Sequence, residues 1–146
     1  MIKNKFFIIL TSAILFTAEA SIYSNSIANS LSHASLGNRQ AKNGDYAQSL
    51  NSLNASIQSN PQNARAYKLR GHVYYAKGNY SKALADLNTV VTLVPDSANA
   101  LADRAIVYSV MGKHGLALSD IERALELKPS SSFAQAVRKE ILERAK

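Results

Sequence analysis

Apolar and small residues recur three and four positions apart along most of this chain, which is the pattern of amphipathic helices. In residues 64–97 one stripe of this kind is formed by Tyr67, Gly71 and Tyr74. A second stripe follows it, formed by Leu84, Leu87 and Val91. Gly78 lies between the stripes, and glycine can adopt the left-handed conformation that ends a helix. The block therefore predicts two helices joined by a short turn.

The same pattern occurs one block earlier and one block later, without a gap. Three columns of the alignment show it: Gly44, Gly78 and Gly112; Leu50, Leu84 and Leu118; and Pro61, Pro95 and Pro129, which are all the prolines of the chain. A proline disfavours the helical conformation of the residue before it, so each second helix should end there. We therefore predict repeats over residues 30–63, 64–97 and 98–131. A period of 34 residues is typical of helix–turn–helix solenoids.

The columns resemble those of the tetratricopeptide repeat (TPR) family. Small residues stand at the eighth and twentieth positions of each block: Gly37, Gly71 and Ala105, then Ser49, Ala83 and Ala117. Tyr74 and Tyr80 provide the aromatic residues of the middle block, whereas the first block departs from the pattern at Gln40 and Ser56. The resemblance implies an all-α fold, an α-solenoid of three antiparallel helix pairs that bury their apolar faces by stacking.

The first 20 residues have the features of a secretory signal peptide. Lys3 and Lys5 precede an apolar run over residues 6–16, and Ala18 and Ala20 are small residues at the two positions that a signal peptidase reads. The run is shorter than the ~20 residues that span a bilayer. We predict cleavage after residue 20 and export to the periplasm or the medium, with an uncleaved anchor as the alternative. Residues 21–29 are predicted to form a flexible lead-in or the first part of an N-terminal cap.

Residues 132–146 predict a C-terminal capping helix. Phe133, Val137 and Ile141 lie four residues apart, and one of the serines at 130–132 can cap the helix start. In the resembling family a final amphipathic helix often covers the last repeat. A membrane-surface role is an alternative that the basic residues suggest, but Glu140 and Glu143 weaken it.

Composition excludes several chemistries. The chain has 146 residues, 17 Lys and Arg against 10 Asp and Glu, a net charge of +7, and no Cys, so disulfides and thiolate metal sites are excluded. The basic residues form no cluster of the kind that binds nucleic acid. His33, His72 and His114 lie in different repeats, and no nucleophile is framed by a base. We therefore expect no enzyme activity, no metal, no cofactor and no nucleic-acid partner.

The resemblance implies that the first helices of the pairs line a concave groove. Carried over position by position, the groove residues are Asn38, Lys42, Arg65, Lys68, His72, Tyr75, Asn99, Asp103 and Ser109. The four from the middle repeat share one helical stripe, which would make the centre of the groove basic and aromatic. A peptide or helix of a partner protein, including one with an acidic group, would suit such a groove.

Alternatives remain to peptide docking in the groove. One is an ordinary solvated helix face, another is self-association through the solenoid ends, and a third is a secreted effector acting on a foreign protein. A monomer or a weak self-associate is expected. One TPR subfamily binds C-terminal chaperone tails with a carboxylate clamp, but only Asn38 matches its residues here, and Asp103 would repel a carboxylate. We therefore do not expect that clamp.

Two charged pairs are present or absent together. Arg70 and Asp86 occupy the seventh and twenty-third positions of the second block, and Arg104 and Asp120 occupy the same positions of the third. The first block has neither charge at these places. We predict a salt bridge between the two helices of each of these repeats, with ligand binding by the arginines as the alternative.

Overall fold

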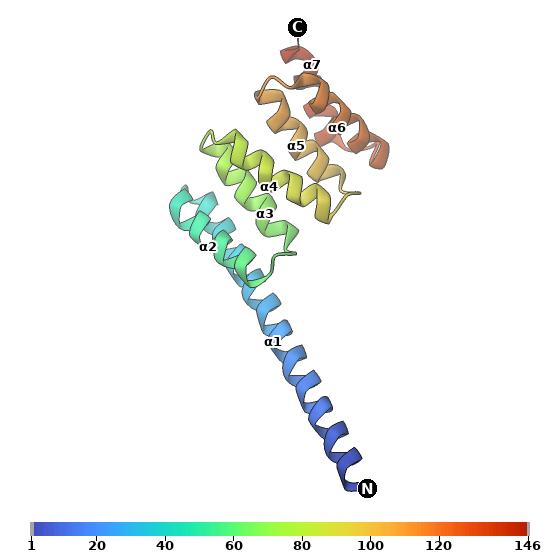
Figure 1. Ribbon diagram of the computed structural model, residues 1–146. Coiled ribbons are helices and arrows are strands. Elements are labelled where there is room, and N and C mark those ends of the chain that lie inside the picture. Colours follow the sequence, from blue (N-terminus) through green and yellow to red (C-terminus); the bar gives the residue numbers. More distant parts are fainter. Residues whose placement is uncertain (1, 146) are drawn as a thin grey trace.

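The computed structural model describes residues 2–145, with side chains from residue 18 onward. This part of the chain consists of seven α-helices and no strand (Figure 1). The helices are α1 (Ile2–Lys42), α2 (Tyr46–Ser59), α3 (Ala64–Ala76), α4 (Tyr80–Leu93), α5 (Ala98–Val110), α6 (His114–Leu127) and α7 (Ser132–Arg144).

The helices pack as successive pairs, α1 with α2, α3 with α4 and α5 with α6, and α7 lies against both α5 and α6. Each pair also contacts the next, so the array is an all-α solenoid (Figure 1). The helix starts repeat with the sequence period: α2, α4 and α6 begin at residues 46, 80 and 114, and α3, α5 and α7 begin at 64, 98 and 132. The predicted fold class is confirmed.

The turns within the pairs show why the glycine column is needed. Gly78 adopts a φ of 72°, a left-handed conformation, and the next N–H, of Asn79, donates to the carbonyl of Tyr74 at 2.8 Å. This bond satisfies a carbonyl that the end of α3 would otherwise leave unpaired. Gly44 and Gly112 have the same role, with φ of 85° and 73°.

The N-cap residues of the second helices differ in whether their side chains bond to the helix. The side chain of Asn79 accepts the N–H of Lys82 at 3.2 Å, as a good N-cap should. Asp45 occupies the equivalent place before α2 and is a residue type that often caps helices, but its carboxylate accepts no helix N–H. Lys113 likewise provides no side-chain cap for α6, as expected from its chemistry.

The core is built by close approach within each pair. Leu53, Leu87 and Ile121 occupy one column of the repeat and are fully or almost fully buried. The small residues of the twentieth position, Ser49, Ala83 and Ala117, have no exposed surface. Small residues are needed at these positions because the two helices of a pair approach closely. A Cβ at Gly71, for example, would already touch the carbonyl of Ala83 at 3.4 Å.

The first pair differs because its core contains a buried polar cluster. Ser30 and Ser56 have no exposed surface, and the hydroxyl of each donates to the carbonyl of the other, at 2.8 and 2.7 Å. The side-chain amide of Asn63 donates to both hydroxyls, at 2.9 and 3.2 Å. Asn63 also caps α3 through its side-chain oxygen. The departure of this repeat from the family pattern is therefore a satisfied hydrogen-bond network.

Helix α7 is positioned by a different stripe from the predicted one. Val137 and Ile141 are buried, but Phe133 is 43% exposed and Ala134 is buried in its place. A spacing of three and then four residues follows one face of a helix of 3.6 residues per turn, whereas two steps of four drift away from it. The start of the helix is capped by Ser131, which accepts the N–H of Ala134 at 3.2 Å.

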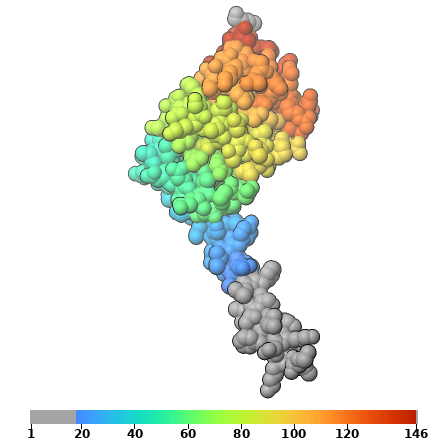
Figure 2. Space-filling model, in the orientation of Figure 1, coloured from blue at the N-terminus to red at the C-terminus, as the bar shows by residue number. Residues whose placement is uncertain are grey.

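Helix α1 extends beyond the packed helices, and its described side chains nearest the N-terminus project from the body of the molecule (Figures 1 and 2). Residues 21–29 are helical, which corrects the prediction of a flexible lead-in. The Ser26 hydroxyl donates to the carbonyl of Ser59 and so ties this part of α1 to α2. The apolar run of the predicted signal peptide, residues 6–16, lies outside the described side chains. No described helix combines the length and apolar character needed to cross a membrane.

Candidate functional site

Two of the predicted groove cations line one cavity. Arg65 and Lys68 of α3 border a hollow of about 290 Å³. Its other lining residues come from α3, α4, α5 and the turn between α4 and α5: Ala64, Val90, Val94, Ser97 and Ala100. Val90 and Ala100 are buried and form an apolar floor, while Arg65 is exposed at the rim. The site therefore combines an apolar hollow with two positive charges one helical turn apart.

The next residue of the predicted stripe pairs across the groove. Nε2 of His72 on α3 lies 3.2 Å from Oδ2 of Asp103 on α5. His72 is about half exposed, whereas the side chain of Asp103 is 12% exposed. The contact joins two successive repeats on their first helices. The contact also engages the carboxylate of Asp103, which would otherwise repel an acidic ligand.

The twelfth position of the second and third repeats packs against other helices rather than facing an open groove. Tyr75 is half-buried beside the core that joins the second and third pairs, and its ring lies 5.5 Å from that of Tyr80. Ser109 is only 6% exposed and lines a small gap between α5 and α7 with Val137 and Ile141. The prediction that Ser109 is open to a ligand was wrong, because α7 packs over this part of α5.

The remaining groove candidates lie away from the Arg65 and Lys68 cavity. Asn38 is half-buried and Lys42 is exposed at the end of α1. Asn99 lines a separate hollow of about 250 Å³ with Leu127 and Lys128. The structure thus brings together Arg65 with Lys68, and His72 with Asp103, and distributes the other candidates along the array.

Both predicted arginine–aspartate pairs are present, and each is bidentate. Nε and Nη2 of Arg70 donate to the two carboxylate oxygens of Asp86 at 2.9 and 2.7 Å. Arg104 donates to Asp120 in the same way, at 2.7 and 2.7 Å. Hydrogen bonding to Asp86 raises the pKa of Arg70 above its ordinary value, against the opposing effect of burial. The same balance raises the pKa of Arg104. These arginines therefore remain charged and connect helices.

Sequence reasoning missed the third partner of each pair. Nη1 of Arg70 donates to Oδ1 of Asn54 in the preceding pair at 2.6 Å, and Arg104 donates to Asn88 at 3.1 Å. Each arginine thus connects three helices from two repeats. The signal was available, because the two asparagines are one period apart. The apolar floor of the cavity was also missed, since it depends on how α4 meets α5.

The described residues contain no cluster of metal-ligating side chains. Among these residues no group of three His, Asp or Glu side chains lies close enough to hold a metal ion.

The fold is a TPR-like α-solenoid, and the comparisons with known proteins agree with this fold. Residues 35–98 match the family model described as tetratricopeptide repeat. No curated protein sequence matches the chain.

Several solved TPR domains have the same fold. The first TPR of Spaghetti (RPAP3) bound to the HSP90 peptide SRMEEVD is 24% identical, with a TM-score of 0.76, over 80% of this chain and 93% of that one. The second TPR domain of human RPAP3, in complex with the HSP70 peptide SGPTIEEVD, is 24% identical with a TM-score of 0.75, over 80% and 98%. The Arabidopsis OM64 TPR domain is 19% identical with a TM-score of 0.76, over 81% and 98%.

Proposed function

We propose that this chain is a non-catalytic protein-interaction module that binds an acidic peptide or helix of a partner. The observation that supports this most directly is the cavity of Arg65 and Lys68 with its apolar floor. A carboxylate paired with two cations above an apolar side chain in the hollow would use both parts of the site. Two similarly folded TPR domains are recorded with chaperone peptides, which is consistent with peptide binding by this fold.

The proposed peptide site differs from a chaperone-tail carboxylate clamp in the position of its positive charges. The cations stand on α3, whereas the next first helix contributes Asp103, which is held by His72. A peptide with an internal acidic residue followed by an aliphatic one fits this distribution better than a chain terminus bound by a clamp.

The groove is tested by measuring peptide affinity. Fluorescently labelled acidic peptides and matched peptides with Gln for Glu are titrated into the chain and into its Arg65→Ala/Lys68→Ala variant. We expect acidic peptides to bind at least about ten-fold more weakly to the variant, since each charge-assisted bond contributes about 1.5 kcal/mol or more. A control variant, Lys113→Ala/Arg123→Ala, removes the same charge from the residue before α6 and from α6 itself. Equal affinity of all three proteins for the acidic peptides would refute the groove assignment.

We also propose that the module is exported after cleavage behind Ala20. The sequence pattern of a signal peptide supports this, and every described residue from 18 to 25 is exposed. Cleavage there would leave the Ser26 contact with α2 intact. Mass spectrometry of the protein from the periplasm or medium of an expressing bacterium should show a chain that begins at Ser21. An intact chain found only in the cytoplasm would refute export.

A further inference from the structure

Helix α7 occupies the place of the first helix of a fourth repeat. It begins 34 residues after α5, and Ser131 caps it as Ser97 caps α5. The buried positions also correspond, since Ala134 takes the place of Ala100 and Ile141 that of Val107, all at most 2% exposed. The register therefore continues without a gap to the end of α7.

The outer face of α7 has no helix on it in the described part of the chain. In the two complete repeats before it, the equivalent face of the first helix is covered by the second helix, which supplies an aspartate to the arginine at the seventh position. Arg138 is the residue at that position in α7. Among residues 18–145 no carboxylate forms a salt bridge with Arg138. One half of the recurring ion pair is thus present without the other.

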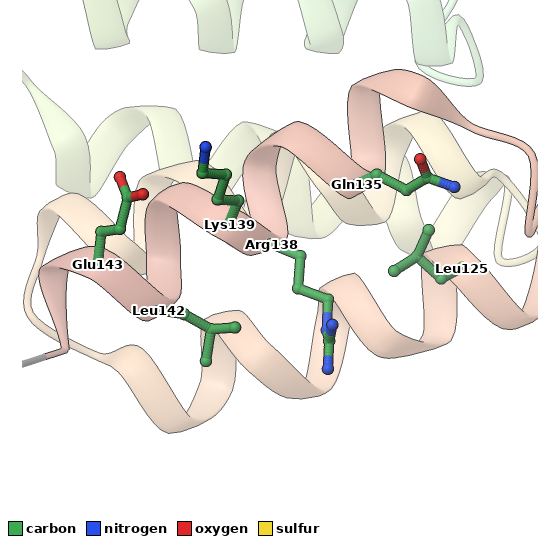
Figure 3. Close-up of a pocket in the computed structure, with 6 residues that line it drawn as sticks. All are labelled: Leu125, Gln135, Arg138, Lys139, Leu142 and Glu143. Carbon is green, nitrogen blue, oxygen red and sulfur yellow. The ribbon is translucent and has the colours of Figure 1, made fainter.

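The surface around Arg138 is hollowed. A depression of about 370 Å³ is lined by Leu125, Gln135, Arg138, Lys139, Leu142 and Glu143, which we call the end face. Arg138 and Leu142 project from α7 on the same side, with Leu125 of α6 beside them (Figure 3). Leu142 is 41% exposed, a large apolar side chain next to an unpaired cation.

We propose that the end face binds a helix of a partner protein that bears an aspartate or glutamate between apolar residues. The pattern of that helix is given by the chain itself, because α6 combines Asp120 with the buried Ala117 and Ile121. Lys139 stands where Gly71 and Ala105 allow close approach, so the docked helix lies farther out than α4 or α6 does. Lys139 also provides a second cation, beside Arg138, for the acidic residue of the partner helix.

A second copy of this chain fits the end face poorly. A head-to-tail stack would bring α1 and α2 of one copy onto α7 of another. Helix α2 contains no acidic residue, and the last turn of α1 adds Arg39 and Lys42. Cations would then face Arg138 and Lys139, which is unfavourable. The charges therefore favour an acidic helix from a different protein.

The test uses a probe derived from α6. A helix-locked peptide with the sequence of residues 114–127 is titrated into the full chain, followed by amide chemical shifts, and a second peptide has Asn in place of the aspartate. We expect shifts at Leu125, Arg138 and Leu142. We also expect affinity about five-fold or more lower for the Asn peptide and for an Arg138→Gln variant. The helix is locked because an isolated helix of this length is marginal in water.

Two controls separate this site from others. Arg144→Gln removes a charge from the same helix at a residue that does not line the end face, and it should leave the affinity unchanged. Arg65→Ala/Lys68→Ala should also bind the peptide normally, so failure of this proposal is distinguishable from failure of the proposed groove. Shifts confined to α5 or to the groove would overturn the proposal. Equal affinity of the Asn peptide, or of Arg138→Gln, would overturn it as well.

Discussion

Replacing Arg70 by alanine should destabilise the fold more than a typical loss of a salt bridge. The guanidinium makes two bonds to Asp86 and one to Asn54, so the substitution removes a link between three helices. The carboxylate of Asp86 would remain in place with its side chain only 7% exposed. A buried charge without a partner is costly because the protein interior solvates it poorly.

The magnitude follows from the exposure of the two partners. Breaking a buried pair costs about 3–5 kcal/mol, whereas exposed pairs contribute about 0–1 kcal/mol. Arg70 is 20% exposed and Asp86 is 7% exposed, which places the pair nearer the buried limit. We expect Arg70→Ala to lower the free energy of unfolding by about 3 kcal/mol. Asp86→Ala should cost less, about 2 kcal/mol, because the long arginine side chain can turn its charge to water.

Urea denaturation followed by circular dichroism measures these values for both single variants and for the double variant. The double variant should cost less than the sum of the two, by about 1–3 kcal/mol, because the substitutions share one interaction. Arg123→Ala is the matched control, since its pair with Glu126 has a similar distance of 2.8 Å but exposures of 55% and 64%. If Arg70→Ala cost no more than this control, the argument from burial would be wrong.

Two further predictions concern the helix contacts of the first and second pairs, and both are measured by the same denaturation assay. A Cβ at Gly37 would lie 2.7 Å from the nearest side-chain carbon, so Gly37→Ala should destabilise by about 1–3 kcal/mol, whereas at Gly71 the nearest atoms are 3.4 Å away. Gly71→Ala should therefore be neutral or stabilising by up to about 1 kcal/mol; equal effects of the two substitutions would contradict this. Ser56→Ala should cost about 1–3 kcal/mol, because it removes hydrogen bonds from the buried cluster. The triple variant Ser30→Ala/Ser56→Ala/Asn63→Ser has the residue types that the third repeat carries at these positions. It should lose less free energy of unfolding than Ser56→Ala alone, and a larger loss would disprove this explanation.

The sequence determined the fold class and the turns between the helices because the features that specify them are local, whereas the start of α1 was not predicted. Glycines at a fixed spacing set the turns, and the residues before Pro61, Pro95 and Pro129 leave the helical conformation and so end α2, α4 and α6. The arginine–aspartate pairs were also predictable. Their residues recur together one period apart, and the resemblance assigns both positions to facing surfaces.

The tertiary structure decided which candidates share a site. Helical spacing placed Arg65, Lys68, His72 and Tyr75 on one stripe, but the neighbouring helices separate them, since one pair borders a cavity, His72 meets Asp103, and Tyr75 packs inward. The exposure of a side chain depends on what packs against it from elsewhere in the chain. For the same reason α7 buries Ser109, and only the packed array shows that Arg138 lacks the covering helix that its two counterparts have among the described residues.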